Sequence, residues 1–130
     1  ISSLNSGQFT KNQNLAGQYA REGMEIVRKV RDSSWANFKG LNSTNYCLAQ
    51  SQTNPTEKTG PCVPSPNVGI FIREIEIFHS DVTCPDPGGN GSRVVSIVSW
   101  SDGKCPSINP YCHKAEIMTC FYRFDVKTAP

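Results

Sequence analysis

The sequence contains no apolar run of about 20 residues, which is the length that a membrane-spanning helix needs. It has only two histidines, and no Gly-rich loop joins a predicted strand to a predicted helix, as a phosphate-binding loop would. Its 13 basic and 11 acidic residues give a net charge of +2, which is too small to indicate a nucleic acid or a membrane surface as the partner. These absences argue against a membrane-embedded segment, a nucleotide-dependent enzyme and a nucleic-acid-binding protein.

The residues that could support catalysis or bind a metal are few and poorly spaced. Cys112 and His113 are adjacent, and adjacent side chains on an extended chain point apart, which disfavours a nucleophile–base pair. Cys105, Cys112 and His113 lack the C-x-x-C spacing of most structural zinc sites. Glu74 and Glu76 alternate along a predicted strand, where a solvated face explains them better than a catalytic carboxylate pair. We therefore expect no enzymatic activity, no catalytic residue, no cofactor and no metal ion.

The chain contains six cysteines. The number of cysteines is even and no two are spaced as C-x-x-C, so disulfide bonds formed in an oxidising compartment are expected. Six cysteines allow 15 pairings, of which nearness in sequence favours only Cys47–Cys62. Each bridge would add roughly 2–4 kcal/mol to stability. The candidates are Cys47, Cys62, Cys84, Cys105, Cys112 and Cys120.

One long segment has helical periodicity, and it lies at the start of the chain. Residues 7–34 are predicted to form a helix on the order of 40 Å long. Gly17 and Gly23 lie inside it, either as tolerated defects or because small residues allow another element to approach closely. Trp35 follows the helix and is expected to fold back as a core anchor. Apolar residues form two adjoining stripes: Leu15, Tyr19, Ile26 and Val30, and Ala16, Ala20, Gly23, Val27 and Val30.

The rest of the chain has the pattern of strands and turns. Residues 36–67 are rich in proline and are predicted to form a loop held by Cys47–Cys62. Residues 68–79, 92–101 and 114–126 are predicted strands, and three consecutive strands favour an antiparallel meander. The expected architecture is an α+β single domain: a helix over 1–35, the loop over 36–67, and an antiparallel sheet within 68–130.

Two segments of the helix and one strand resemble a bacterial family. The run from Tyr19 to Arg28 (YAREGMEIVR) and the run from Arg31 to Trp35 (RDSSW) resemble the lower part of the N-terminal helix of type IV pilins and pseudopilins. They are similar to a branch in which A-R-E-G-I-E and then R-D-S-x-W end that helix. The run from Arg93 to Trp100 (RVVSIVSW) is similar to the V-x-V-x-V-x-W strand of the same branch. Together these runs cover about a quarter of the chain.

The resemblance implies a pilin-like fold, in which a long N-terminal helix packs on an antiparallel sheet of three to four strands. In that family the upper half of the helix is apolar, has a glutamate near the mature N-terminus and follows a leader that a prepilin peptidase cleaves. Ile1 would then lie partway down a longer helix. The sheet-facing residues would be Ala20, Gly23, Val27 and Val30, together with Trp35. Contacts with neighbouring subunits would come from Phe9, Leu15 and Tyr19.

The implied function is that of a major or minor structural subunit in an extracellular type IV pilus-like filament, serving adhesion, motility or DNA uptake. Its partners would be other pilin subunits and a host-cell or surface ligand, and it would reside in the inner membrane before assembly. It would contact the membrane only through an apolar helix that this sequence does not contain. The alternative is a secreted, disulfide-linked binding module, such as an adhesin domain, that does not form filaments.

Overall fold

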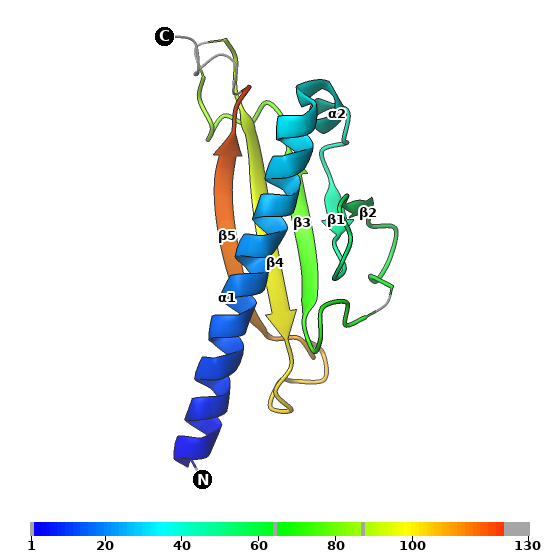
Figure 1. Ribbon diagram of the computed structural model, residues 1–130. Coiled ribbons are helices and arrows are strands. Elements are labelled where there is room, and N and C mark those ends of the chain that lie inside the picture. The colour runs from blue at the N-terminus through cyan, green and yellow to red at the C-terminus, as the bar shows by residue number, and fades with distance from the viewer. Residues whose placement is uncertain (1, 64, 87, 124–130) are drawn as a thin grey trace.

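The computed structural model describes residues 2–63, 65–86 and 88–123, and in it one long helix packs on a five-stranded antiparallel sheet (Figure 1). The predicted α+β architecture is confirmed. The strands follow the order β2-β1-β3-β4-β5 across the sheet. The elements in chain order are α1 (Ser2–Ser33), α2 (Trp35–Lys39), β1 (Asn45–Cys47), β2 (Thr56–Glu57), β3 (Ile72–Phe78), β4 (Ser92–Trp100) and β5 (His113–Phe121).

The sheet has five strands, so the expectation of three to four was wrong. The additional strands β1 and β2 lie within residues 36–67, which were predicted to be a loop, and most of the short helix α2 lies there too. β1 has three residues and β2 has two, which is too short for an alternating pattern to be recognised. β1 is held by its long-range neighbour, since Tyr46 lies opposite Ile75 of β3 and is buried.

Helix α1 begins at Ser2, which precedes the periodic segment 7–34 but lies within the range 1–35 predicted for the helix. It has 32 residues and a length of about 48 Å, whereas the nine-residue strands β4 and β5 span only about 30 Å. The N-terminal turns of α1 therefore extend past the ends of the strands (Figure 1). Helix α1 ends at Ser33, because Ser34 adopts an extended backbone. The Oγ of Ser34 accepts a hydrogen bond from the Asn37 amide and so caps the N-terminus of α2.

The three long strands differ from the prediction mainly at their ends. β3 begins at Ile72 and not at residue 68, because Val68 and Phe71 pair across a tight turn in which Gly69 has a φ of 57°. β4 ends at Trp100, one residue early. β5 ends at Phe121, and residues 124–126 of the predicted strand lie outside the described residues.

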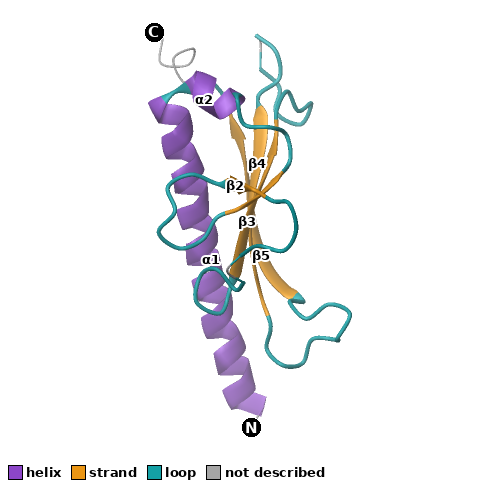
Figure 2. Cartoon of the chain, turned by 90° about the vertical axis from the view of Figure 1, so that its right-hand side faces the viewer, coloured by secondary structure: helices purple, strands orange, loops and turns teal. Residues whose placement is uncertain are grey.

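The helix and the sheet form two layers, which Figure 2 shows edge-on. Alternate residues of β3, β4 and β5 pack in clusters with residues of α1, and no helix within the described ranges covers the opposite face of the sheet. Two clusters of buried side chains fill the space between the layers. One contains Met24, Val27, Phe38, Tyr46, Leu48, Ile75, Ile77, Val94 and Phe121, and the other contains Ala16, Ala20, Phe71, Val98 and Trp100.

All six cysteines form disulfide bonds, as predicted. Cys47 is joined to Cys62, which is the pairing that nearness favoured, and this bridge links β1 to the proline-rich segment. The Cys84–Cys120 bridge ties the β3–β4 loop to the end of β5. The third bridge, Cys105–Cys112, closes the β4–β5 loop. The disulfides therefore hold the loops at both ends and at one side of the sheet.

Candidate functional site

The sheet approaches α1 closely at Gly23. A Cβ atom at this position would lie 2.8 Å from Ser96 Oγ and 3.0 Å from Arg73 Cδ, which is too close for any larger residue. At Gly17 the only atom within 4 Å of such a Cβ would be the far end of Arg21, at 3.7 Å. Of the two explanations given above for glycines inside the helix, close approach of another element applies to Gly23, and a tolerated defect applies to Gly17. Gly23 lets the sheet approach the helix, and Gly17 has no such role.

The residues that were predicted to pack against the sheet lie at this interface. Ala20 and Val27 are completely buried, on either side of Gly23. Val30 and Trp35 are partly buried and pack against the first core cluster. Trp35 does so as the first residue of α2, with its ring centroid 5.5 Å from that of Phe38.

Arg73 is the central polar residue of the interface, although it is not among the site residues predicted from the sequence. Its side chain is fully buried between α1 and β3. Its Nε donates to the Leu48 carbonyl at 3.0 Å, and its Nη2 donates to the Ala49 carbonyl at 3.3 Å. Its Nη1 donates to the Tyr19 carbonyl at 3.1 Å and to Glu22 Oε1 at 2.7 Å. Its alternation with Ile75 and Ile77 along β3 was the signal that places it on the buried face.

The three residues predicted to contact neighbouring subunits all touch the sheet of their own chain. Phe9 is 38% exposed, and its ring lies 6.0 Å from Trp100 and 5.2 Å from His113. Leu15 and Tyr19 are half-buried against the second core cluster. Only the remaining surface of each side chain faces outward, so contacts with a neighbour stay a prediction.

The outward face of α1 is entirely polar along the part that covers the sheet. Glu22 and Glu25 alternate with basic residues there, and the Arg28 guanidinium lies 3.1 Å from Glu25 Oε2. This face offers charges of both signs to a partner and no apolar patch. The exposed residues are Gln18, Arg21, Glu22, Glu25, Lys29, Asp32 and Ser33.

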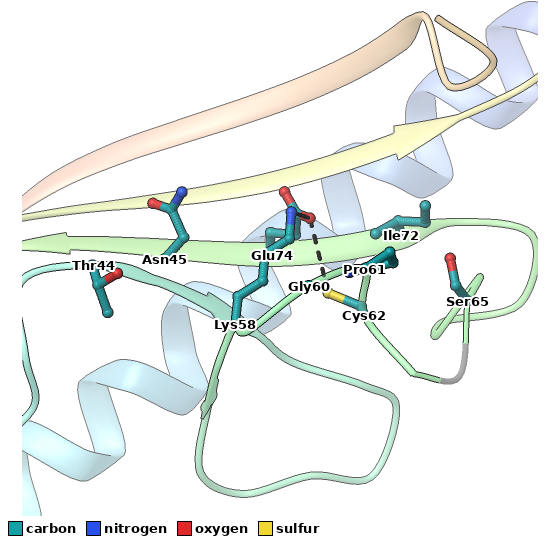
Figure 3. A pocket seen from close by; sticks show the side chains of 9 residues that line it. All are labelled: Thr44, Asn45, Lys58, Gly60, Pro61, Cys62, Ser65, Ile72 and Glu74. Carbon is teal, nitrogen blue, oxygen red and sulfur yellow. Dashed lines mark hydrogen bonds and ion pairs between the residues drawn. The ribbon is translucent and has the colours of Figure 1, made fainter.

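A groove of about 580 Å³ lies beside β1 and β3, bordered by the Cys47–Cys62 segment (Figure 3). Inside it Lys58 Nζ donates to Glu74 Oε2 at 2.6 Å, so the two charges neutralise each other. The described lining residues include no aromatic side chain and no free thiol. It is lined by Thr44, Asn45, Lys58, Gly60, Pro61, Cys62, Ser65, Ile72 and Glu74.

A cluster of sulfur, nitrogen and oxygen atoms lies at the base of β5. His113 Nε2 donates to Asp102 Oδ2 at 2.8 Å, and the Lys104 amide donates to Asp102 Oδ1 at 2.9 Å. The Lys104 amide and His113 lower the pKa of Asp102, although partial desolvation opposes them. One ligand atom each from Cys105, Cys112 and His113 lies within 4.8 Å of the others.

This clustering corrects the expectation that the side chains of Cys112 and His113 point apart. That expectation assumed an extended chain through both residues, but β5 begins at His113 and Cys112 belongs to the preceding loop. The loop turns the sulfur of Cys112 back toward Cys105, to which it is bonded. Because both sulfurs are in a disulfide, His113 has no thiolate to activate, and the cluster is not a nucleophile–base pair in this state.

His79 is partly buried between two loops at the other end of the sheet. Its Nε2 donates to the Leu41 carbonyl at 2.7 Å, so its Nδ1 accepts from Ser92 Oγ, also at 2.7 Å. Burial lowers the pKa of His79 below 6.5, although the bond to Leu41 opposes this effect. The neutral ring joins the α2–β1 connection to β4, and its edge packs on Phe38.

Two other groups with shifted pKa values also hold loops in place. The hydroxyl and amide of Thr83 lower the pKa of Asp81, which also pairs with Arg93 at 3.1 Å. Burial raises the pKa of Tyr46, whose hydroxyl donates to the Asn42 carbonyl at 2.6 Å. Both sites are saturated with partners from their own chain, which is typical of structural rather than catalytic groups.

No protein-family model, no curated protein and no solved structure matches this chain. Within the described residues, no helix is both long enough and apolar enough to cross a membrane.

Proposed function

We propose that this chain is a non-enzymatic structural subunit, a major or minor pilin, of an extracellular type IV pilus-like filament. The observation that carries the proposal is the extension of α1 beyond the sheet that it covers (Figure 1). The runs Tyr19–Arg28 and Arg31–Trp35, which resemble the pilin helix, lie on the part of α1 and at the start of α2 that pack against the domain.

The length of α1 is difficult to explain by the needs of the domain alone. Among the side chains that the structure describes, from residue 7 onward, Asn12 is the first buried one in α1 and Phe9 is the first with a ring contact to the sheet. Gly7 and Gln8 are exposed. Helical turns that pack against nothing gain little stability in water. If α1 served only to cover its own sheet, we would expect its N-terminus to lie near the ends of the strands. A helix that continues is suited to a spine shared with neighbouring subunits.

In a filament, an apolar segment before α1 would hold the subunit in the inner membrane and would then pack in the filament core. The domain would form the outer surface, where three disulfides would resist mechanical stress and proteolysis. The partners are other pilin subunits, and a host-cell or surface ligand would bind to the loops. Adhesion, motility and DNA uptake are the processes that such a filament serves.

The first test is the genomic sequence that precedes the codon for Ile1. The proposal requires a leader with a prepilin peptidase site, followed by roughly 20 apolar residues that continue the helix. An ordinary secretory signal peptide cleaved directly before Ile1 would refute it.

The second test uses the polar face of α1. Reversing two exposed charges, Arg21→Glu with Lys29→Glu, is expected to reduce the number of filaments per cell seen by electron microscopy. The circular dichroism of the isolated domain should not change. The matched control is Lys114→Glu, an exposed charge on the opposite face of the sheet, which should leave filaments intact. Filaments unchanged by the double variant would contradict the proposed orientation.

The alternative is a secreted, disulfide-linked binding module that does not form filaments. It is favoured by two exposed apolar side chains next to disulfide bonds: Ile108, inside the Cys105–Cys112 loop, at 94% exposure, and Val63, which follows Cys62, at 90% exposure. A cleaved signal peptide, together with a monomeric protein in the culture medium, would support this reading over the first.

A further inference from the structure

We propose that reduction of the Cys105–Cys112 bridge converts the β4–β5 loop into a binding site for a thiophilic divalent cation such as Zn²⁺. The ligands are the two thiolates and one ring nitrogen of His113. Their ligand atoms already lie within 4.8 Å of one another. This inference concerns the loop alone and does not depend on the proposed role in a filament.

The geometry of the cluster fits a tetrahedral metal site. Zinc binds thiolate at about 2.3 Å and imidazole at about 2.0–2.1 Å, so neighbouring ligand atoms around it lie roughly 3.5–3.8 Å apart. Breaking the S–S bond lets the two sulfurs separate to this distance, and the Cα atoms of Cys105 and Cys112 are already 5.5 Å apart. Three protein ligands leave the fourth position to water, as in many zinc sites.

Asp102 positions the imidazole for this role. It accepts a hydrogen bond from His113 Nε2 at 2.8 Å, which leaves the lone pair on the other ring nitrogen. A carboxylate that holds a metal-binding histidine in this way fixes its tautomer and raises its affinity. The ring is also flanked by Trp100 at 5.4 Å and Phe9 at 5.2 Å, which restrict its rotation. Asp102 is therefore assigned as a positioning residue.

This bridge is the one that a reductant can open with the least loss of structure. Cys105 and Cys112 are both partly exposed, whereas each of the other bridges contains a buried residue, Cys62 or Cys84. Its sequence separation of 7 is also the shortest of the three, so opening it increases the conformational entropy of the unfolded chain by the smallest amount.

The chemistry requires a two-electron reductant, either two equivalents of a thiol or one of a phosphine. With a thiol, the S–S bond breaks, two cysteine thiols form, and the thiol is oxidised to its own disulfide. A phosphine becomes the phosphine oxide and takes its oxygen from water. Binding of the cation then releases the two thiol protons to solvent.

The test begins with limited reduction of the folded protein by a phosphine, followed by alkylation of one portion and peptide mapping. We expect two free thiols, at Cys105 and Cys112. The unalkylated portion is freed of reductant without oxygen and titrated with Co²⁺. It should develop thiolate-to-cobalt absorption and the visible bands of a tetrahedral site, and Zn²⁺ should displace the cobalt. Protein that was not reduced should show neither band.

Variants separate the metal site from binding elsewhere on the surface. His113→Ala should abolish the tetrahedral spectrum, and Asp102→Asn should weaken zinc binding by about 10- to 100-fold. Asp81→Asn, at the opposite end of the sheet, is the control and should have no effect. The inference is overturned if the reduced protein gives no tetrahedral cobalt spectrum, if the free thiols map to other cysteines, or if Cys105→Ser with Cys112→Ser binds equally well. None of these readouts involves filaments, so failure here leaves the proposed function untouched.

Discussion

Replacing Arg73 with methionine is expected to lower the free energy of unfolding by about 1–4 kcal/mol. The arginine side chain is fully buried, and it donates to the carbonyls of Leu48, Ala49 and Tyr19 and to the carboxylate of Glu22. Methionine keeps a long unbranched side chain in the same space but donates no hydrogen bond. The substitution therefore removes the donors while it retains most of the packing.

The magnitude follows from the acceptors that are left behind. The buried Leu48 carbonyl accepts from the guanidinium, and leaving such an acceptor unsatisfied costs about 1–3 kcal/mol. The Ala49 carbonyl also accepts from the Gln52 amide at 3.2 Å, so its loss is smaller. The Tyr19 carbonyl lies within α1, where a helical amide also bonds to it, so its loss is smaller. Glu22 is 53% exposed and would be solvated again, so the ion pair itself contributes less than about 1 kcal/mol.

Urea unfolding of the oxidised protein at pH 7 provides the assay, with Glu22→Gln as the matched variant. Arg73→Met should lower the unfolding midpoint several times more than Glu22→Gln, with similar m-values in both. Equal losses in the two variants would mean that the ion pair, and not the backbone contacts, is what Arg73 supplies. A loss below about 1 kcal/mol for Arg73→Met would refute the reasoning altogether.

Three further predictions concern single features of the fold. Gly17→Ala should raise stability by about 1 kcal/mol through helix propensity, whereas Gly23→Ala should lower it by about 1–3 kcal/mol because its Cβ would collide with the sheet. Because burial lowers the pKa of His79 below 6.5, the unfolded chain binds a proton before the folded chain does. The stabilisation from the neutral ring is complete above pH 6.5 and is lost as the pH falls toward the lower folded-state pKa, which urea unfolding at a series of pH values would detect. Removing the Cys84–Cys120 bridge, whose sequence separation is 36, should cost about 4 kcal/mol in thermal unfolding, against about 2 kcal/mol for the bridge with a separation of 7.

Each of these predictions has an outcome that contradicts it. The glycine argument fails if the two alanine variants change stability in the same direction. A His79→Gln variant that shows the same decline below pH 6.5 as the parent protein would assign that decline to another group. Equal losses from the two bridges would mean that loop length does not govern their contributions.

The sequence predicted the features that depend on local patterns. The apolar stripe through Ala20 and Val27 recurs with the helical period, so the long helix and its buried face were recognised without a structure. Alternation along residues 92–101 located β4 to within one residue, and alternation along residues 114–126 located the start of β5 to within one residue but placed its end beyond Phe121. The even cysteine count predicted full pairing. In each case the signal lies within a short segment, because the period of a helix or strand is set by local backbone geometry.

Only the tertiary structure decided the features that depend on residues far apart in the chain. β1 and β2 are too short to form alone: β1 pairs with the edge of β3, and β2 pairs with β1. Arg73 reaches the Tyr19 carbonyl 54 residues away, and Gly23 meets Ser96 on β4. The convergence of Cys105, Cys112 and His113 depends on a loop that folds back on itself. Residue patterns specify which face of an element is apolar, but the packing of α1 on the sheet decides which side chains meet, and therefore where charges are buried and ligand atoms converge.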